Sequence, residues 1–317
     1  MGEWLLRGVG VLLLLSALAL AVSYAPDRPA QSLVARWALP PSDFMDVRGQ
    51  LVHFRDQGPR EDPQPVVLIH GTSASLHTWE GWVGALQGRR RVITFDLPGF
   101  GLTGPFTGDY APDDYSGDAL ARFTLDLLEA LRLPRVVIGG NSLGGEVAWR
   151  VASLAPQRVA GLILVDASGL PSKPGVRPLG WMLARVPVLN RITEWVLPRS
   201  LVEQGLAQAY GDPRRVTPAL VDRYFELALR AGNRRALALR LQHLGADAGA
   251  ERIAALKLPT LILWGGRDRL IPPATAQAFA QRIAGSRVVV FDALGHVPQE
   301  EDPVRSVQPV LDFLGLR

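Results

Sequence analysis

Short apolar or alternating runs repeat along most of the chain, separated by longer segments of helical periodicity. These runs lie at residues 51–56, 66–70, 91–95, 135–139, 161–165, 260–264 and 287–291. Apolar runs of this length are typical of strands covered on both faces, as in a parallel sheet. Helical spacing of apolar residues predicts helices at residues 114–131, 143–154, 273–284 and 302–314. We therefore expect an α/β fold, a mostly parallel sheet with helices on both faces.

The alternation of strands and helices stops between residues 165 and 260, where the sequence has helical rather than strand-like spacing. We predict that residues 171–250 form an inserted helical cap, entered through the Pro- and Gly-rich segment 171–180. The core then consists of residues 47–170 and 251–317.

The N-terminus carries a run without charge at residues 8–26, after Glu3 and Arg7. A helix of that length would extend roughly 28 Å at about 1.5 Å per residue, close to the thickness of a membrane hydrocarbon core. We predict a transmembrane anchor or a signal segment at residues 1–25 and a Pro-rich linker at residues 26–46. The expected protein is membrane-anchored with its folded body outside the cytoplasm, or exported if the segment is cleaved.

Composition narrows the classes of function. The 317 residues are 48% hydrophobic and 20% charged, as in a folded globular protein, and cysteine is absent, which excludes disulfides and cysteine chemistry. The net charge is +4, but no Lys/Arg block is interleaved with aromatic residues, so we expect no nucleic-acid partner. Metal-ligand spacings and phosphate- or dinucleotide-binding loops are missing from the sequence, so we expect no metal and no cofactor.

A candidate nucleophile stands between the strand-like run 135–139 and the predicted helix 143–154. Gly140-x-Ser142-x-Gly144 matches the GxSxG pattern in the strand–turn–helix context that this pattern requires. The tight turn forces the serine into a strained backbone conformation, and the glycines on either side remove Cβ atoms that would clash there. Ser142 also lies at a helix N-terminus, where developing negative charge is stabilised.

A serine nucleophile needs a histidine base, which in turn needs an orienting acid. His296 follows the strand-like run 287–291, and Asp268 follows the run 260–264. Parallel strands have their carboxyl ends at one edge of the sheet, so we expect both side chains to meet Ser142 there.

The loop after the run 66–70 offers donors for an oxyanion. We expect the backbone N–H groups of Thr72 and Leu143 to form an oxyanion hole, with Gly71 allowing the close approach of the backbone. His70, at the end of a buried strand, is expected to be structural rather than a second base.

Five segments together resemble the α/β-hydrolase superfamily, over a stretch from about residue 47 to the C-terminus. They are HGTSASLHTW (70–79), DLPGFGLTG (96–104), GNSLGG (140–145), WGGRDRLIPP (264–273) and GHVPQEEDP (295–303). The resemblance implies an eight-stranded sheet, a helical cap and a Ser142–His296–Asp268 triad. It also implies Thr72 and Leu143 as oxyanion donors, and it favours Asp268 over Asp166 as the triad acid.

Within that superfamily, a serine at the elbow argues against the relatives that open epoxides or displace halide with an aspartate. The resemblance leaves carboxylesterases, monoacylglycerol lipases, carbon–carbon hydrolases of the meta-cleavage-product type and perhydrolases. We predict an esterase or monoacylglycerol-lipase-like enzyme for apolar small-molecule esters, working near a membrane, with Trp79 and Phe100 as candidates for the pocket wall. The alternatives are a carbon–carbon hydrolase and a non-catalytic binding protein with the same fold.

Overall fold

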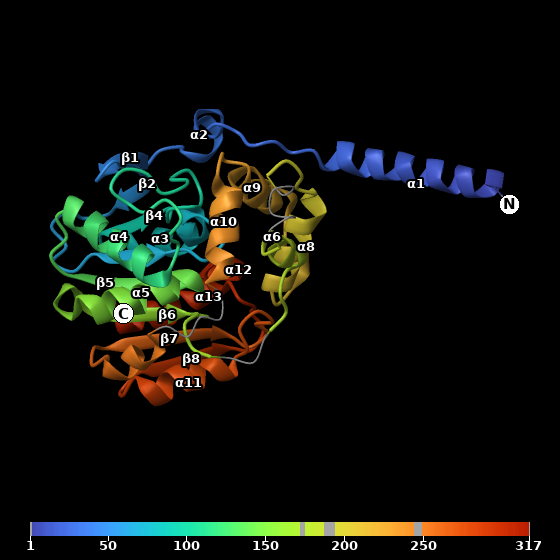
Figure 1. Cartoon of the computed structure of the whole chain (residues 1–317). Coiled ribbons are helices and arrows are strands. Elements are labelled where there is room, and N and C mark those ends of the chain that lie inside the picture. Colours follow the sequence, from blue (N-terminus) through green and yellow to red (C-terminus); the bar gives the residue numbers. More distant parts are fainter. Residues whose placement is uncertain (1, 172–174, 187–193, 244–248, 317) are drawn as a thin grey trace.

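Figure 1 shows the computed structural model, which describes residues 2–171, 175–186, 194–243 and 249–316. Its described residues form an eight-stranded sheet with the order β1-β2-β4-β3-β5-β6-β7-β8. The strands are β1 (Ser42–Val47), β2 (Gln50–Gln57), β3 (Val66–Ile69), β4 (Val92–Phe95), β5 (Val136–Asn141), β6 (Val159–Val165), β7 (Thr260–Gly265) and β8 (Arg287–Phe291). Strands β3 to β8 are parallel, whereas β2 is antiparallel to both β1 and β4. The predicted mostly parallel, eight-stranded sheet is confirmed.

The central strands are apolar because both of their faces are covered. In β3, Val67 and Ile69 belong to one buried cluster, and Val66 and Leu68 belong to another. The first cluster includes residues of α4 (Gly117–Ala130), α5 (Leu143–Leu154) and α11 (Ala274–Arg282), and the second includes residues of α3 (Glu80–Leu86) and α14 (Gln308–Phe313). Successive side chains of a strand point to opposite faces, so two helical layers enclose the sheet.

The C-terminal segment differs from its prediction as a single helix over residues 302–314. It consists of α12 (Pro298–Glu301), α13 (Pro303–Ser306) and α14. Proline has no N–H to donate and is tolerated only in the first turn of a helix, so Pro303 and Pro309 divide the segment. Short 3-10 helices lie at Leu76–Trp79, Pro156–Arg158, Pro213–Arg215 and Ala250–Ala255.

Further helices lie between β6 and β7, in the region predicted as the cap. They are α6 (Leu179–Ala184), α8 (Arg199–Ala209), α9 (Pro218–Ala228) and α10 (Asn233–Gln242), and Figure 1 shows them grouped at one side of the sheet. A buried ion pair of 2.6 Å between Arg240 Nη2 and Glu146 Oε2 attaches α10 to α5. We use the word cap for residues 171–250; these boundaries stay a prediction, and residues 172–174 of its entry segment lie outside the described residues.

The N-terminal apolar run forms helix α1 (Gly2–Ser23), which projects from the body in Figure 1. In the part of the chain that the structure describes, no helix is both long and apolar enough to cross a membrane. The predicted membrane-anchored localisation is therefore wrong. That prediction treated residues 8–26 as one charge-free helix, whereas α1 ends at Ser23. The charge-free part of α1 therefore ends three residues before the end of the run on which that prediction rested.

The segment predicted as a linker, residues 26–46, contains regular structure. It includes α2 (Gln31–Trp37) and most of β1. The chain between α1 and α2 is attached to the cap, because Arg28 N–H donates to the Leu229 carbonyl at 2.6 Å and Ala231 N–H donates back to the Arg28 carbonyl at 2.8 Å. The linker prediction is corrected accordingly.

Candidate active site

Ser142 stands at the sharp turn between β5 and α5, as its motif predicts. Its φ angle is +54°, a region that non-glycine residues rarely occupy. A Cβ on Gly140 would lie 2.1 Å from the carbonyl carbon of Gly144, and a Cβ on Gly144 would lie 2.0 Å from the carbonyl oxygen of Ile69. Both positions therefore require glycine for the turn to close behind the serine.

His296 and Asp268 meet at the carboxyl edge of the sheet. Nδ1 of His296 lies 2.7 Å from Oδ2 of Asp268, and both side chains are buried. The other oxygen of Asp268 accepts hydrogen bonds from the N–H groups of Leu270 and Ile271 at 2.8 and 3.0 Å. The carboxylate is thus fixed by its own loop, and the imidazole keeps Nε2 for the cavity that His296 and Ser142 both line.

Asn141 holds the backbone of His296 beside the serine turn. Its side-chain amide donates to the His296 carbonyl at 2.8 Å and to the Val165 carbonyl at 3.2 Å. Asn141 is not among the site residues predicted from the sequence. The signal available in the sequence was an amide side chain at the position between Gly140 and Ser142.

The histidine loop is also bonded to the cap. His296 N–H donates to the Ala209 carbonyl at 2.6 Å. Glu301, which is buried, accepts the N–H groups of Gly295 and Gly211 on Oε2 at 2.7 and 2.9 Å, and that of Asp212 on Oε1 at 2.9 Å. Glu301 is not among the site residues predicted from the sequence, because an acidic run next to a proline is ordinarily exposed.

The loop after β3 approaches the serine closely. A Cβ on Gly71 would lie 2.8 Å from Oδ1 of Asn141 and 3.2 Å from Cβ of Ser142. Thr72, the next residue, lines the same cavity as Ser142. The N–H of Leu143 belongs to the first residue of α5, so it has no acceptor within the helix. The structure thus brings the two predicted donors beside the serine, and their role as an oxyanion hole stays a prediction.

His70 is fully buried behind this loop. Its Nδ1 is 2.7 Å from the carbonyl of Gly71, and its Nε2 accepts the N–H of Leu97 at 2.9 Å. Burial lowers the pKa of His70 below its usual value. Both ring nitrogens are occupied by backbone groups, so His70 organises the loop and is not placed to act as a base.

A second carboxyl group, Asp166, lies next to the pair. The ligand atoms of Asp166, Asp268 and His296 all lie within 4.8 Å of one another. Asp166 is fully buried and accepts the N–H of Gly265 at 2.9 Å, whereas the hydrogen bond to the imidazole comes from Asp268. These three groups are close enough to hold a metal ion, but Asp268 and His296 are already bonded to each other. Burial, followed by the charge of Asp268, raises the pKa of Asp166 well above its usual value.

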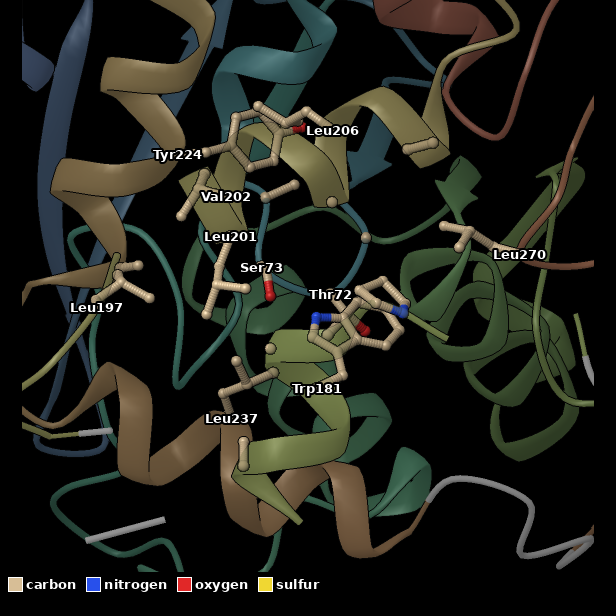
Figure 2. Close-up of a pocket in the computed structure, with 18 of the residues that line it drawn as sticks. Thr72, Ser73, Trp181, Leu197, Leu201, Val202, Leu206, Tyr224, Leu237 and Leu270 are labelled. Carbon is tan, nitrogen blue, oxygen red and sulfur yellow. The ribbon is translucent and has the colours of Figure 1, made fainter. Parts of the chain in front are cut away.

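Ser142 and His296 open into a cavity of about 330 Å³. Figure 2 shows the side chains of Trp181, Leu201 and Leu237 from the cap together with Thr72 and Ser73 among the residues that line it. Further apolar side chains that line it are Pro178, Leu183, Val196, Leu197, Pro198, Val202, Leu206, Leu270 and Val297. A cavity of this size and character is typical of a small-molecule site.

One residue of fixed charge lies in the described wall of this cavity. Arg234 donates from Nε and Nη2 to Oδ1 of Asp27 at 3.2 and 2.6 Å, and its side chain is 5% exposed. Its remaining nitrogen, Nη1, is buried without a hydrogen-bond partner. The guanidinium charge is therefore compensated by the segment that follows α1.

The two aromatic residues proposed for the pocket wall lie elsewhere. Trp79 is fully buried in the core cluster on one face of the sheet, and its ring centroid lies 5.0 Å from that of Trp82. Phe100 belongs to the core cluster on the other face and lies 5.8 Å from the ring of His70. Neither is among the residues that line the cavity. Large aromatic side chains near a strand end suit a core as well as a pocket, and the sequence pattern does not separate the two.

Comparisons with known proteins agree with this architecture. A family model described as the alpha/beta hydrolase fold matches residues 64–303. The chain is 31% identical over 262 residues to a 2-hydroxy-6-oxo-2,4-heptadienoate hydrolase of Pseudomonas putida, covering 79% of this chain and 88% of the relative.

Two solved structures are similar over nearly their whole length. A meta-cleavage product hydrolase from Pseudomonas fluorescens has a TM-score of 0.73 and 25% identity, covering 86% of this chain and 97% of its own. A thermophilic esterase from Thermogutta terrifontis has a TM-score of 0.69 and 26% identity, covering 86% and 98%. The protein is a hydrolase, and the chain belongs to the α/β-hydrolase family.

Proposed function

We propose that the protein is a serine hydrolase that cleaves carboxylic esters of apolar small molecules. The observation that carries this proposal is a cavity lined by Ser142 and His296 at one place and by apolar cap side chains elsewhere. The nucleophile and its base thus face a space that favours an uncharged acyl group, because burying an unpaired charge there would be costly.

In the proposed reaction, Ser142 Oγ attacks the ester carbonyl while His296 Nε2 accepts its proton. Asp268 orients the imidazole and stabilises its charged form. The N–H groups of Thr72 and Leu143 bind the oxyanion, at about 3 kcal/mol for each donor. His296 then returns the proton to the leaving alcohol, and water hydrolyses the acyl-enzyme by the same sequence of steps.

The carbon–carbon alternative has support of its own. Two of the similar proteins are named as a 2-hydroxy-6-oxo-2,4-heptadienoate hydrolase and a meta-cleavage product hydrolase, and both act on carbon–carbon bonds. Similarity alone therefore favours carbon–carbon cleavage over ester cleavage. A substrate named as an -oate carries a carboxylate, which needs a cation in this apolar wall. Nη1 of Arg234 is the candidate partner. We rank this function second because Asp27 already compensates the Arg234 charge.

Steady-state turnover of the full-length chain separates the two functions. The substrates are p-nitrophenyl esters from C2 to C16 and 2-hydroxy-6-oxo-2,4-heptadienoate, each with wild type, Ser142→Ala and the exposed-serine control Ser32→Ala. We expect ester hydrolysis that is abolished in Ser142→Ala and kept in Ser32→Ala. A kcat/KM for the dienoate that exceeds the value for every ester would replace the ester proposal with the carbon–carbon function.

A further inference from the structure

The proposed acid of the triad has a second carboxyl group directly behind it. Strands β6 and β7 are parallel neighbours, with Val165 opposite Leu263, so the loops that follow them lie side by side. Asp166 begins the first loop and Asp268 lies in the second. Both side chains are buried, and one carboxylate oxygen of each lies within 4.8 Å of the other and of a ring nitrogen of His296.

Hydrogen bonding around the two carboxyl groups is unequal. Asp268 accepts two backbone N–H groups on Oδ1 and faces His296 Nδ1 with Oδ2. Asp166 accepts the N–H of Gly265 on Oδ1, whereas its Oδ2 is buried with no partner. An ionised carboxylate with an unsatisfied oxygen is unfavourable in a site from which water is excluded.

Among the described residues, the titratable groups found to act on Asp166 include no cation of fixed charge. These groups are Asp268 in the loop after β7, Glu301 at the end of α12, and the imidazole of His296. Two of the three are acids, and neighbouring buried carboxylates cannot both keep a full negative charge. Asp268 has the donors that stabilise an anion, so the proton belongs on Asp166.

We propose that Asp166 is a positioning residue that holds a proton on Oδ2 and donates it to Asp268. The two carboxyl groups then share one proton and carry one negative charge. With this bond Asp268 accepts about four hydrogen bonds, which is the capacity of an ionised carboxylate. Its single charge is thereby held against His296. The inference rests on the proposed triad, but not on whether the substrate is an ester or a diketone.

The backbone at Asp166 limits which substitutions are informative. Its φ angle is +45°, a conformation that aspartate and asparagine tolerate better than other non-glycine residues. Asparagine also keeps a donor in the place of the Oδ2 proton. Asp166→Asn therefore copies the protonated acid, whereas Asp166→Ala removes the donor.

Kinetics on a p-nitrophenyl ester test the positioning role. We expect Asp166→Ala to lower kcat at least about tenfold at an unchanged KM, because it removes a hydrogen bond to a charged group. Asp166→Asn should restore kcat to within about threefold of wild type. A folded Asp166→Ala with wild-type kcat, or an Asp166→Asn as impaired as the alanine variant, would overturn the proposal.

The pH dependence of stability locates the proton independently of activity. The pKa of Asp166 is raised above its unfolded value of about 3.8, so wild type loses stability as pH rises from there through the folded pKa. Asp166→Asn has no proton to retain, so its urea midpoint should exceed that of wild type at pH 7 and approach it at pH 4.

The matched control is Asp96→Asn, which alters a buried aspartate that is paired with His53. That variant should have a lower midpoint than wild type at pH 7. A drop of the same kind in Asp166→Asn would show that Asp166 is ionised and would contradict the proposal. If wild type has no serine-dependent turnover, the proposed function fails, while the urea midpoints still decide where the proton lies.

Discussion

The carbonyl of His296 accepts a hydrogen bond of 2.8 Å from the side-chain amide of Asn141, the residue directly before Ser142. This bond connects the loop after β8 to the end of β5, which are separated by two strands in the sheet. The base and the nucleophile are therefore positioned by one direct contact, in addition to the Asp268 carboxylate that holds the imidazole.

Replacing the acid with its amide tests the orientation of the imidazole. Asp268→Asn keeps the shape of the side chain but cannot hold the Nδ1–H tautomer, so we expect kcat for the best p-nitrophenyl ester to fall about 10⁴-fold. The control is Asp292→Asn, an exposed residue just after β8, which should keep wild-type kcat. A loss of less than tenfold in Asp268→Asn would argue that another acid orients His296.

Close packing between the cap and the histidine loop makes Gly295 a sensitive position. A Cβ there would lie 2.3 Å from the Ala209 carbonyl oxygen and 2.4 Å from the Gly211 nitrogen, so Gly295→Ala must displace the loop of His296. We expect kcat to fall about 100-fold, as for a misplacement of about 1 Å.

The matched substitution is Gly84→Ala in α3, where an added Cβ meets nothing within 4 Å. It should keep kcat and raise the free energy of unfolding by about 0.4–1 kcal/mol. Unfolding in urea and ester turnover measure both effects. Equal kcat for the two alanine variants would show that contact with the cap does not position the base.

Narrowing the cavity should change the preference for chain length. Leu201→Trp adds volume to a cap residue that lines the cavity in Figure 2. The quantity to compare is a ratio: kcat/KM for the longest ester that wild type accepts, divided by kcat/KM for the C2 ester. We expect this ratio to fall at least about tenfold in Leu201→Trp. The control Leu154→Trp, at an exposed position of α5, should leave the ratio unchanged. An unchanged ratio in Leu201→Trp would place the acyl chain elsewhere.

Asp96 provides a prediction about pH and stability. Burial alone would raise its pKa, but the charge and hydrogen bond of His53 outweigh burial and hold the pKa of Asp96 well below its usual value. A depressed pKa gives stability that is present above about pH 4 and is lost as pH falls through the folded pKa.

Asp96→Asn should therefore lower the free energy of unfolding by about 3 kcal/mol at pH 7 and by less at pH 3. Urea unfolding at the two pH values measures the difference. A loss that is larger at pH 3 than at pH 7 would show that Asp96 is not the ionised partner.

The predictions from the sequence were best where local pattern and chemistry agree. The runs at residues 66–70, 135–139 and 260–264 are apolar because both faces of these strands are covered, and that requirement is readable without a structure. The GxSxG turn is readable for a similar reason, because steric closure at Gly140 and Gly144 allows only glycine.

Features that depend on distant partners were not readable. Strand β1 lies at an edge of the sheet and has mixed burial, so it carries no clear alternation. Asn141 and Glu301 act through backbone groups far away in the chain, and their own neighbours in sequence give no sign of it. Trp79 was proposed for the pocket because residue type alone does not show which side of the sheet a side chain enters.

The most direct test of the central claim is covalent labelling of the full-length protein with a fluorophosphonate, followed by peptide mass spectrometry. A serine activated by a histidine base reacts with such a probe, whereas an ordinary surface serine does not. The account predicts one adduct, located on Ser142, that is absent from Ser142→Ala and strongly reduced in His296→Ala. An adduct on another serine would contradict the account by placing the nucleophile at that residue. A folded protein that neither labels nor hydrolyses esters would also contradict it and would favour a non-catalytic binding protein.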